Sequence, residues 1–149
     1  MLGNDENVAR ALFAPKMIYN GELQTEAFKL RETISEKYIS VVRTTMPSWK
    51  ADIMNIPQGK NRKLYGYALM NVGDIRKASF NNVVYEVKEC DNSFLKSHAG
   101  IFITVAGESL IGGRRMNTIT DQASQDFMLL LIQRRLVEIA RKGLHEMKQ

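Results

Sequence analysis

The stretch DQASQDFMLLLIQRRLVEIARKG, residues Asp121–Gly143, predicts one long helix near the C-terminal end of the chain. Its apolar residues recur at helical spacing, and Asp121 places a carboxylate where the helix dipole favours negative charge. Thr118 or Thr120 is the expected N-cap, and Gly143 after two basic residues is a typical C-terminal signal. This helix is expected to pack on a sheet.

Six consecutive apolar residues, Phe127–Ile132, lie within this helix and therefore surround it instead of forming one stripe. More than one helix face must then be covered. Either the helix crosses a sheet as a central element, or its second face meets another copy of the chain. A homo-oligomer formed through this helix is one hypothesis, because a large exposed apolar patch is unusual in a monomer.

Upstream of the helix, segments rich in β-branched and aromatic residues predict short strands separated by turns. These segments are residues 38–45, 64–72, 83–89 and 101–105, the last entering a hairpin that Leu110 and Ile111 continue. Gly66, inside the second segment, indicates a β-bulge or a close approach of another backbone.

Helices are also expected in the first half of the chain. Asn4 followed by two acidic residues predicts a short helix or ordered arm over residues 4–13, within an N-terminal segment 1–15. Apolar residues at helical spacing predict a helix over residues 22–37, and residues 74–78 predict one further helical turn. The polar stretch 48–63 is expected to be a mobile loop.

Together these elements predict an α+β fold, because strands follow one another without regular alternation with helices. The expected architecture is a single domain, residues 1–149, with a mostly antiparallel sheet of about five short strands and the long helix packed on it. Residues 144–149 are expected to be a frayed tail. A chain of 149 residues is long enough to bury one core without disulfides.

The composition predicts a soluble cytoplasmic protein. It is 44% hydrophobic and 25% charged, with a single cysteine and a net charge of +5. A lone cysteine fits a reducing compartment. We expect no export signal, because the N-terminus lacks a basic segment followed by an apolar one, and no association with membranes, because no apolar run approaches the ~20 residues that span a bilayer.

Few residues are suited to metal or redox chemistry. The chain has two histidines and one cysteine, and neither a C-x-x-C nor an H-E-x-x-H motif, so we expect no metal site and no cofactor. His98 is the candidate for acid–base chemistry, because it lies among small residues where a turn enters an apolar strand. The alternative is a structural histidine that satisfies local hydrogen bonds.

Basic residues occur in clusters that predict a polyanion-binding surface. The two clusters on the helix are seven residues apart, nearly two turns, and therefore align in one stripe. Tyr65 and Tyr67 lie just after the loop cluster and are candidate stacking rings for nucleic acid. The alternative is a solvated helix face in which Glu138 pairs with the arginines. The residues concerned are Lys60, Arg62 and Lys63 in the loop, and Arg134, Arg135, Arg141 and Lys142 on the helix.

Four spaced segments share a layout with a group of small bacterial proteins. They are Glu26–Leu30, Ile39–Arg43, Tyr65–Leu69 and Ser97–Ile101. Their order resembles small uncharacterised bacterial proteins that carry "A-F", "S-V-x-R" and "H-A-x-I" motifs, over about residues 16–105. The resemblance implies no activity, but it makes Ser40, Arg43 and His98 a candidate cluster.

These patterns support three functional hypotheses. The first is a binding module whose basic surface engages a polyanion, such as nucleic acid, or an acidic protein. The second is an enzyme acting on a phosphate-containing substrate, in which Arg43 clamps the anion, His98 transfers a proton and Ser40 or Tyr65 orients the substrate. It requires these residues to converge on one pocket. The third is a structural homo-oligomer formed through the C-terminal helix.

Overall fold

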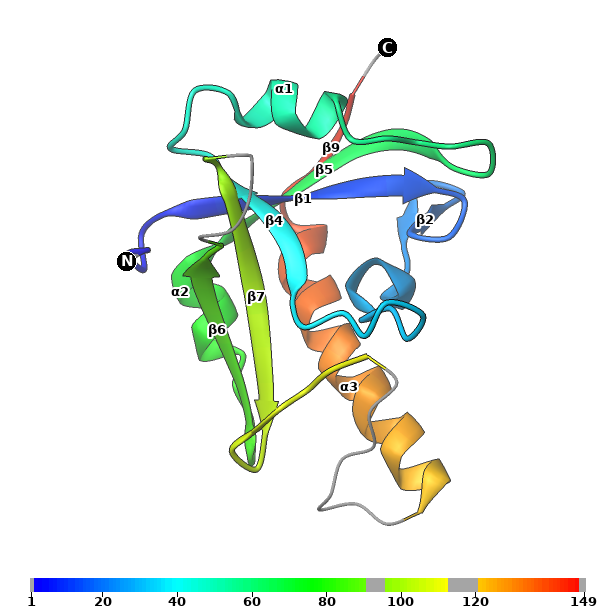
Figure 1. Ribbon diagram of the computed structural model, residues 1–149, viewed down its shortest axis with the longest axis vertical. Coiled ribbons are helices and arrows are strands. Elements are labelled where there is room, and N and C mark those ends of the chain that lie inside the picture. Colours follow the sequence, from blue (N-terminus) through cyan, green and yellow to red (C-terminus); the bar gives the residue numbers. More distant parts are fainter. Residues whose placement is uncertain (1, 91–95, 113–120, 148–149) are drawn as a thin grey trace.

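The computed structural model describes residues 2–90, 96–112 and 121–147. In these residues the chain forms a mostly antiparallel sheet with a long C-terminal helix, which confirms the α+β fold class (Figure 1). The strand order of the main sheet is β6-β7-β4-β1-β5-β9, and β8 adds to β7. Its strands are β1 (Asn7–Ala14), β4 (Ile39–Arg43), β5 (Lys63–Asn71), β6 (Val83–Glu89), β7 (His98–Val105), β8 (Glu108–Ser109) and β9 (Leu144–Glu146). A separate hairpin pairs β2 (Ile18–Tyr19) with β3 (Glu22–Leu23).

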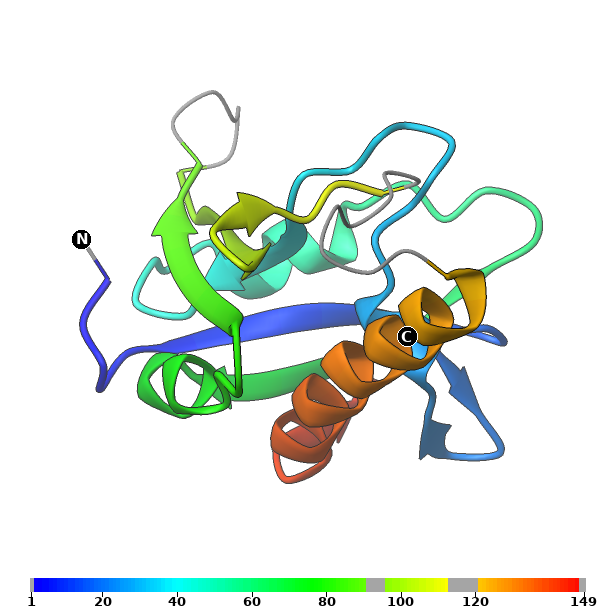
Figure 2. The ribbon, with the colours of Figure 1, turned by 90° about the horizontal axis from the view of Figure 1, so that it is seen from below.

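The helices cover the two faces of the sheet unequally. Figures 1 and 2 show α2 (Val72–Lys77) and α3 (Gln122–Arg141) on one face and α1 (Trp49–Met54) on the other. The predicted C-terminal helix is confirmed as α3. Its N-cap is Asp121, whose carboxylate accepts a hydrogen bond from the Ser124 N–H at 2.9 Å, whereas Thr118 and Thr120 lie outside the described residues.

The main core lies between the sheet and α3. Tyr85 on β6 is buried there, and its hydroxyl donates a 2.7 Å hydrogen bond to the Ile132 carbonyl of α3. Leu136 is also fully buried at this interface. A smaller cluster of seven buried residues, here called the second cluster, lies on the α1 face. Its members are Ala9, Ala11, Phe13, Val42, Ile53, Leu64 and Tyr67.

The four strands predicted from composition correspond to β4, β5, β6 and β7, and the predicted helical turn to α2. Other predictions were wrong. Residues 4–13 do not form a helix or an arm, because β1 lies between β4 and β5 in the sheet. Val8 and Leu12 face the main core while Ala9 and Phe13 face the second cluster. The chain therefore has more sheet than the five strands expected.

The helix predicted over residues 22–37 is also wrong. The chain there forms β3, one turn of 3-10 helix, η1 (Thr25–Phe28), and then turns, including Ser35 at a positive φ of 47°. Ala27 and Phe28 are buried against the main core. The stretch 48–63 is not a continuous loop, since it contains α1, whose Ile53 is fully buried.

Residues 144–146 form β9 and are not a frayed tail. β9 pairs with β5, and the ring of His145 stacks on Tyr67 with centroids 5.1 Å apart. Gly66 confirms the predicted close approach, because a Cβ there would overlap the His145 carbonyl. A register shift lies opposite it in β1, between Leu12 and Phe13. The hairpin after β7 pairs β8 with β7, and Leu110 continues it as predicted, because its N–H donates to the Ile103 carbonyl at 2.8 Å.

Candidate functional site

The site begins where β1 and β4 separate. Only two residue pairs join these strands, Val8 with Arg43 and Ala9 with Val42. The Arg43 N–H donates to the Ser97 carbonyl next to β7, so by alternation the backbone groups of Ser40 point back toward β1. The pairing of β1 with β4 does not extend to Ser40, and a side chain bonds the Ser40 carbonyl instead of a β1 backbone group.

That side chain is Arg10, in the middle of β1. Its Nη1 donates to the Ser40 carbonyl at 2.9 Å, and its Nε donates to the Ala27 carbonyl of η1 at 3.0 Å. Within the described residues no acceptor bonds its Nη2. Burial lowers the pKa of Arg10 to about 10, with Glu36 opposing the shift and Arg31 and Arg62 adding to it. The guanidinium therefore stays charged at neutral pH.

Arg62 is held in the same manner. Its Nη2 donates to the Pro57 carbonyl at 2.7 Å and its Nε to the Gln58 carbonyl at 3.3 Å. The guanidinium carbon lies 4.0 Å from the centre of the Phe13 ring, a cation–π contact. Its Nη1 has no hydrogen-bond acceptor in the described part of the chain. Both guanidinium groups are thus fixed by neutral carbonyls, which do not neutralise their positive charge.

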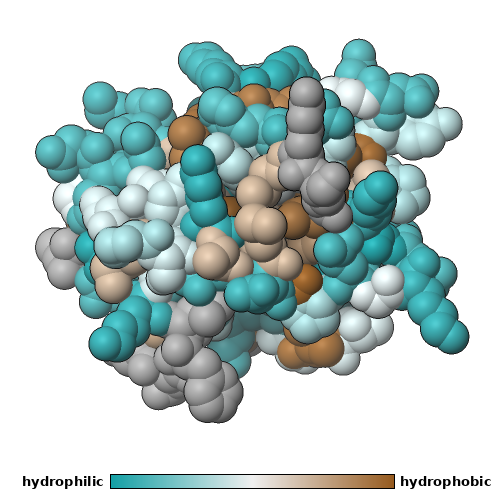
Figure 3. All heavy atoms as spheres, turned by 90° about the horizontal axis from the view of Figure 1, so that it is seen from above, coloured by the Kyte–Doolittle hydropathy of each residue, from teal (hydrophilic) through white to brown (hydrophobic). Residues whose placement is uncertain are grey.

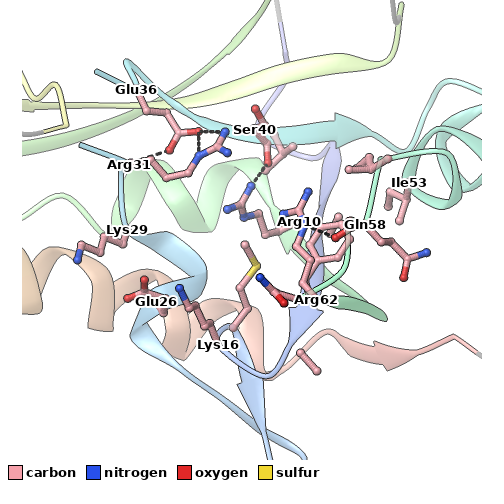
Figure 4. A pocket seen from close by; sticks show the side chains of 18 of the residues that line it. Arg10, Lys16, Glu26, Lys29, Arg31, Glu36, Ser40, Ile53, Gln58 and Arg62 are labelled. Atoms are coloured by element: carbon pink, nitrogen blue, oxygen red, sulfur yellow. Dashed lines mark hydrogen bonds and ion pairs between the residues drawn. The ribbon is translucent and has the colours of Figure 1, made fainter. Parts of the chain in front are cut away.

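Arg10 and Arg62 line one cavity of about 970 Å³, here called the Arg10 pocket. Figure 4 shows both side chains entering it, with Ser40 and Glu36 above them and Lys16 and Glu26 below. β1, β4, the η1 segment and the chain after α1 form its walls. Its lining includes six basic and three acidic residues, namely Arg10, Lys16, Lys29, Arg31, Lys60 and Arg62, and Glu26, Glu32 and Glu36.

One of the three acids is committed to a partner of its own. Glu36 Oε2 lies 3.0 Å from Nη2 and 3.3 Å from Nε of Arg31, and its Oε1 accepts the Arg31 backbone N–H. This pair is solvent-exposed on the Arg31 side, where the side chain is 63% exposed. Basic residues therefore outnumber acidic ones around the two fixed guanidinium groups, which gives the pocket a positive electrostatic potential.

Ser40 and His98 come together in this pocket. The Nε2 of His98 lies 3.3 Å from the Ser40 Oγ, and both residues line the cavity. The Tyr38 ring meets the imidazole edge-on, with centroids 5.7 Å apart. Burial lowers the pKa of His98 below its ordinary value, so the ring is neutral at pH 7 and Nε2 can accept a proton.

Arg43 does not join Ser40 and His98. His98 pairs with Val42 across β4 and β7, so those two side chains and that of Ser40 share one face, while Arg43 points to the other. Its guanidinium bonds Glu6 at 3.0 Å and Glu89 at 2.7 Å. The expected convergence of Arg43 with His98 is therefore corrected: the arginine at the Ser40–His98 pair is Arg10.

The predicted basic surface is divided by the fold. Lys60 and Arg62 line the Arg10 pocket, whereas Lys63 is exposed at the start of β5. On α3, Arg134, Arg135 and Arg141 are exposed, and so is Lys142, the C-cap of this helix. Arg135 donates to the Ala78 carbonyl at 3.1 Å and lies 4.2 Å above the Phe80 ring, so it also fastens α3 to the end of α2.

Of the two tyrosines proposed as stacking rings, Tyr67 is buried and Tyr65 is half-buried. Tyr67 is buried in the second cluster, where the Trp49 ring meets it edge-on, and Tyr65 packs against the main core. In the described residues, Glu138 forms no ion pair with Arg134 or Arg135, the pairing considered as the alternative to a binding surface.

Sequence reasoning missed Arg10. Its signal is a single charge inside the otherwise apolar stretch Val8–Phe13, which a strand buried on both faces tolerates only when the charge is satisfied or functional. The helix predicted over residues 4–13 concealed this signal, because a charge on a helix is ordinarily solvated.

Two further searches of the described residues bear on function. No group of three or more histidine, cysteine, aspartate or glutamate side chains is arranged to hold a metal ion there. No helix in that part of the chain is long and apolar enough to cross a membrane. Comparisons of the chain with protein-family models, with curated protein sequences and with solved structures find no match. The function must therefore be argued from the Arg10 pocket itself.

Proposed function

We propose that this protein is a binding module for a small anion, a phosphate or carboxylate group, held in the Arg10 pocket. The observation that carries the proposal is the pair of guanidinium groups in one cavity, each held by two backbone carbonyls and each with one terminal nitrogen unbonded in the described residues. Carbonyls orient a guanidinium without neutralising it, so both charges remain available to an anion.

This arrangement supports tight binding for two physical reasons. Hydrogen bonds between ionised partners are about twice as strong as neutral ones, and guanidinium matches phosphate and carboxylate geometry. The side chains are also already fixed, so a ligand does not have to order them. Burial adds to the effect, because the lowered pKa of Arg10 indicates a charge that lacks solvation and gains from an anion.

Calorimetric titration with inorganic pyrophosphate at low ionic strength tests the proposal. We expect binding that weakens at least tenfold in Arg62→Met, because the charged hydrogen bond it removes contributes about 1.5–3 kcal/mol. Arg135→Met is the matched control, since Arg135 also donates to a carbonyl and lies over an aromatic ring, but outside the pocket. Equal affinity of wild type and Arg62→Met, or loss of affinity in the control alone, would refute the proposal.

An extended polyanion is the alternative ligand of a binding module, with the α3 stripe as its surface. Arg134 and Arg141 are exposed, and neither forms an ion pair with an acidic side chain in the described residues. This alternative predicts that binding to a generic DNA duplex falls steeply between low and moderate salt. A flat salt dependence excludes it.

A second candidate function is hydrolysis of a phosphate monoester, favoured by the 3.3 Å contact of Ser40 and His98. The Ser40 Oγ would attack phosphorus while the His98 Nε2 takes its proton, and the released alcohol would leave with that proton as the ester P–O bond breaks. Water would then cleave the phosphoserine. Arg10 takes the anion-clamping role that the sequence suggested for Arg43.

Release of nitrophenol from p-nitrophenyl phosphate tests this candidate. Ser40→Ala and His98→Gln should each abolish turnover while pyrophosphate still binds. A rate equal to that of buffer for the wild-type protein, or unchanged turnover in both variants, excludes the enzyme.

A further inference from the structure

The Arg10 pocket has an apolar side as well as a charged one. Five of the seven buried residues of the second cluster also line the pocket: Ala9, Ala11, Phe13, Val42 and Ile53. Among the helices that the structure describes, α1, with its six residues, is the one on the sheet face they occupy. All five are at most 7% exposed, and the half-buried Met17 and Ile56 add apolar surface to the lining.

The size of the cavity exceeds what an anionic group needs. About 970 Å³ lies at the upper end of the range for pockets that hold whole small molecules. An inorganic phosphate at Arg10 and Arg62 would fill only a small part of this volume. Figure 3 shows hydrophobic residues between hydrophilic ones on the surface of the molecule seen from above, where α1 lies in Figure 1.

We infer that the ligand of the Arg10 pocket is a soluble amphiphile, an unbranched alkyl chain carrying a phosphate or carboxylate head. The inference rests on the proposed function, because the head is the anion held by Arg10 and Arg62. The chain lies beside Ala11 and the half-buried Ile56, which both line the pocket. Charge complementarity positions the head, and the apolar wall accommodates the alkyl chain attached to it.

A series of alkyl phosphates of increasing chain length measures how much the alkyl chain contributes to the affinity. Ethyl, butyl, hexyl and octyl phosphate are titrated below their micelle concentrations, with pyrophosphate as the head-only probe and octanoate as the carboxylate. Affinity should rise about fourfold for each methylene that enters the pocket. Arg62→Met should weaken every phosphate in the series by a similar factor.

Ala11→Leu separates the apolar side from the charged one. It fills part of the cavity, so octyl phosphate should lose at least tenfold in affinity while pyrophosphate binding is unchanged. Ala51→Leu, at an exposed position of α1 outside the pocket, is the matched control and should change neither. Should Ala11→Leu fail to fold, Ile56→Ser at a half-buried pocket position should give the same selective loss.

The outcomes distinguish this inference from the function on which it rests. Equal affinity along the series with pyrophosphate still bound overturns the amphiphile and leaves the anion site. Failure of every phosphate and of octanoate to bind overturns both. Sedimentation with vesicles containing phosphatidic acid separates the two sources of such a ligand: binding to vesicles without binding to dissolved octyl phosphate overturns the soluble amphiphile.

Discussion

Replacing Arg10 by methionine tests whether its charge is kept for a ligand or for the fold. Methionine preserves the apolar stem and removes the guanidinium, so the carbonyls of Ala27 and Ser40 lose their donors. Each carbonyl left without a partner costs about 1–3 kcal/mol, which together destabilises the variant by about 2–6 kcal/mol.

The removal of a desolvated charge offsets much of this loss. The fall of the Arg10 pKa to about 10 means that the folded protein disfavours the charged guanidinium by about 3 kcal/mol, at ~1.4 kcal/mol per tenfold change in the protonation constant. The net expectation is a free energy of unfolding lowered by about 1 kcal/mol, and by less than about 3 kcal/mol. Binding of pyrophosphate should be lost at the same time.

Urea denaturation at pH 7 measures the difference. Arg76→Met is the comparison, because Arg76 bonds the Glu86 carboxylate at 2.6 Å and also bonds Asn4 and the Leu2 carbonyl. That arginine braces the fold, and its variant should lose more stability than Arg10→Met. A loss above about 4 kcal/mol in Arg10→Met would refute the reasoning, since Arg10 would then be mainly a structural brace.

Three further predictions concern the rest of the molecule. Burial lowers the pKa of His98, so the unfolded chain binds more protons there and the free energy of unfolding falls as the pH drops below about 6.5. The difference between the urea midpoints at pH 5 and pH 7 should therefore be smaller in His98→Gln than in the wild type. An unchanged difference contradicts this role of His98. Gly66→Val should displace β9, because its side chain overlaps the His145 carbonyl; fast amide hydrogen exchange over residues 144–146 would show the displacement, and full protection would count against it. Phe127 is 63% exposed on α3; if this face joins two copies of the chain, Phe127→Lys should convert a dimer to a monomer in sedimentation equilibrium, whereas a wild-type monomer at high concentration excludes the homo-oligomer.

Local sequence patterns predict an element well when one of its faces is buried. α3, β6 and β7 have alternation or helical periodicity that reflects such a face, and the pattern locates each of them within a few residues. β1 is buried on both sides, so its apolar residues run together and imitate a helix, and the acidic residues before it favour the same interpretation. The local pattern predicts a helix over residues 4–13 because it does not show that this segment lies between two other strands in the sheet.

In the candidate site, too, some residues could be predicted from local sequence and others depend on tertiary context. The sequence predicts Ser40 and His98 as a cluster, and the strand register brings them within 3.3 Å. Arg43 could have been excluded from the sequence, because residues three apart in a strand point to opposite faces. Arg10 could not have been assigned, since its role depends on the separation of β1 from β4, which no local signal records.

The most direct test of the Arg10 pocket is an NMR titration that monitors the arginine side-chain Nε–H signals. Addition of octyl phosphate should shift the signals of Arg10 and Arg62 together, saturating at one equivalent, while the signal of Arg135 stays in place. Shifts confined to Arg135 and the other α3 arginines, with Arg10 and Arg62 unmoved, would contradict an anion site in this pocket.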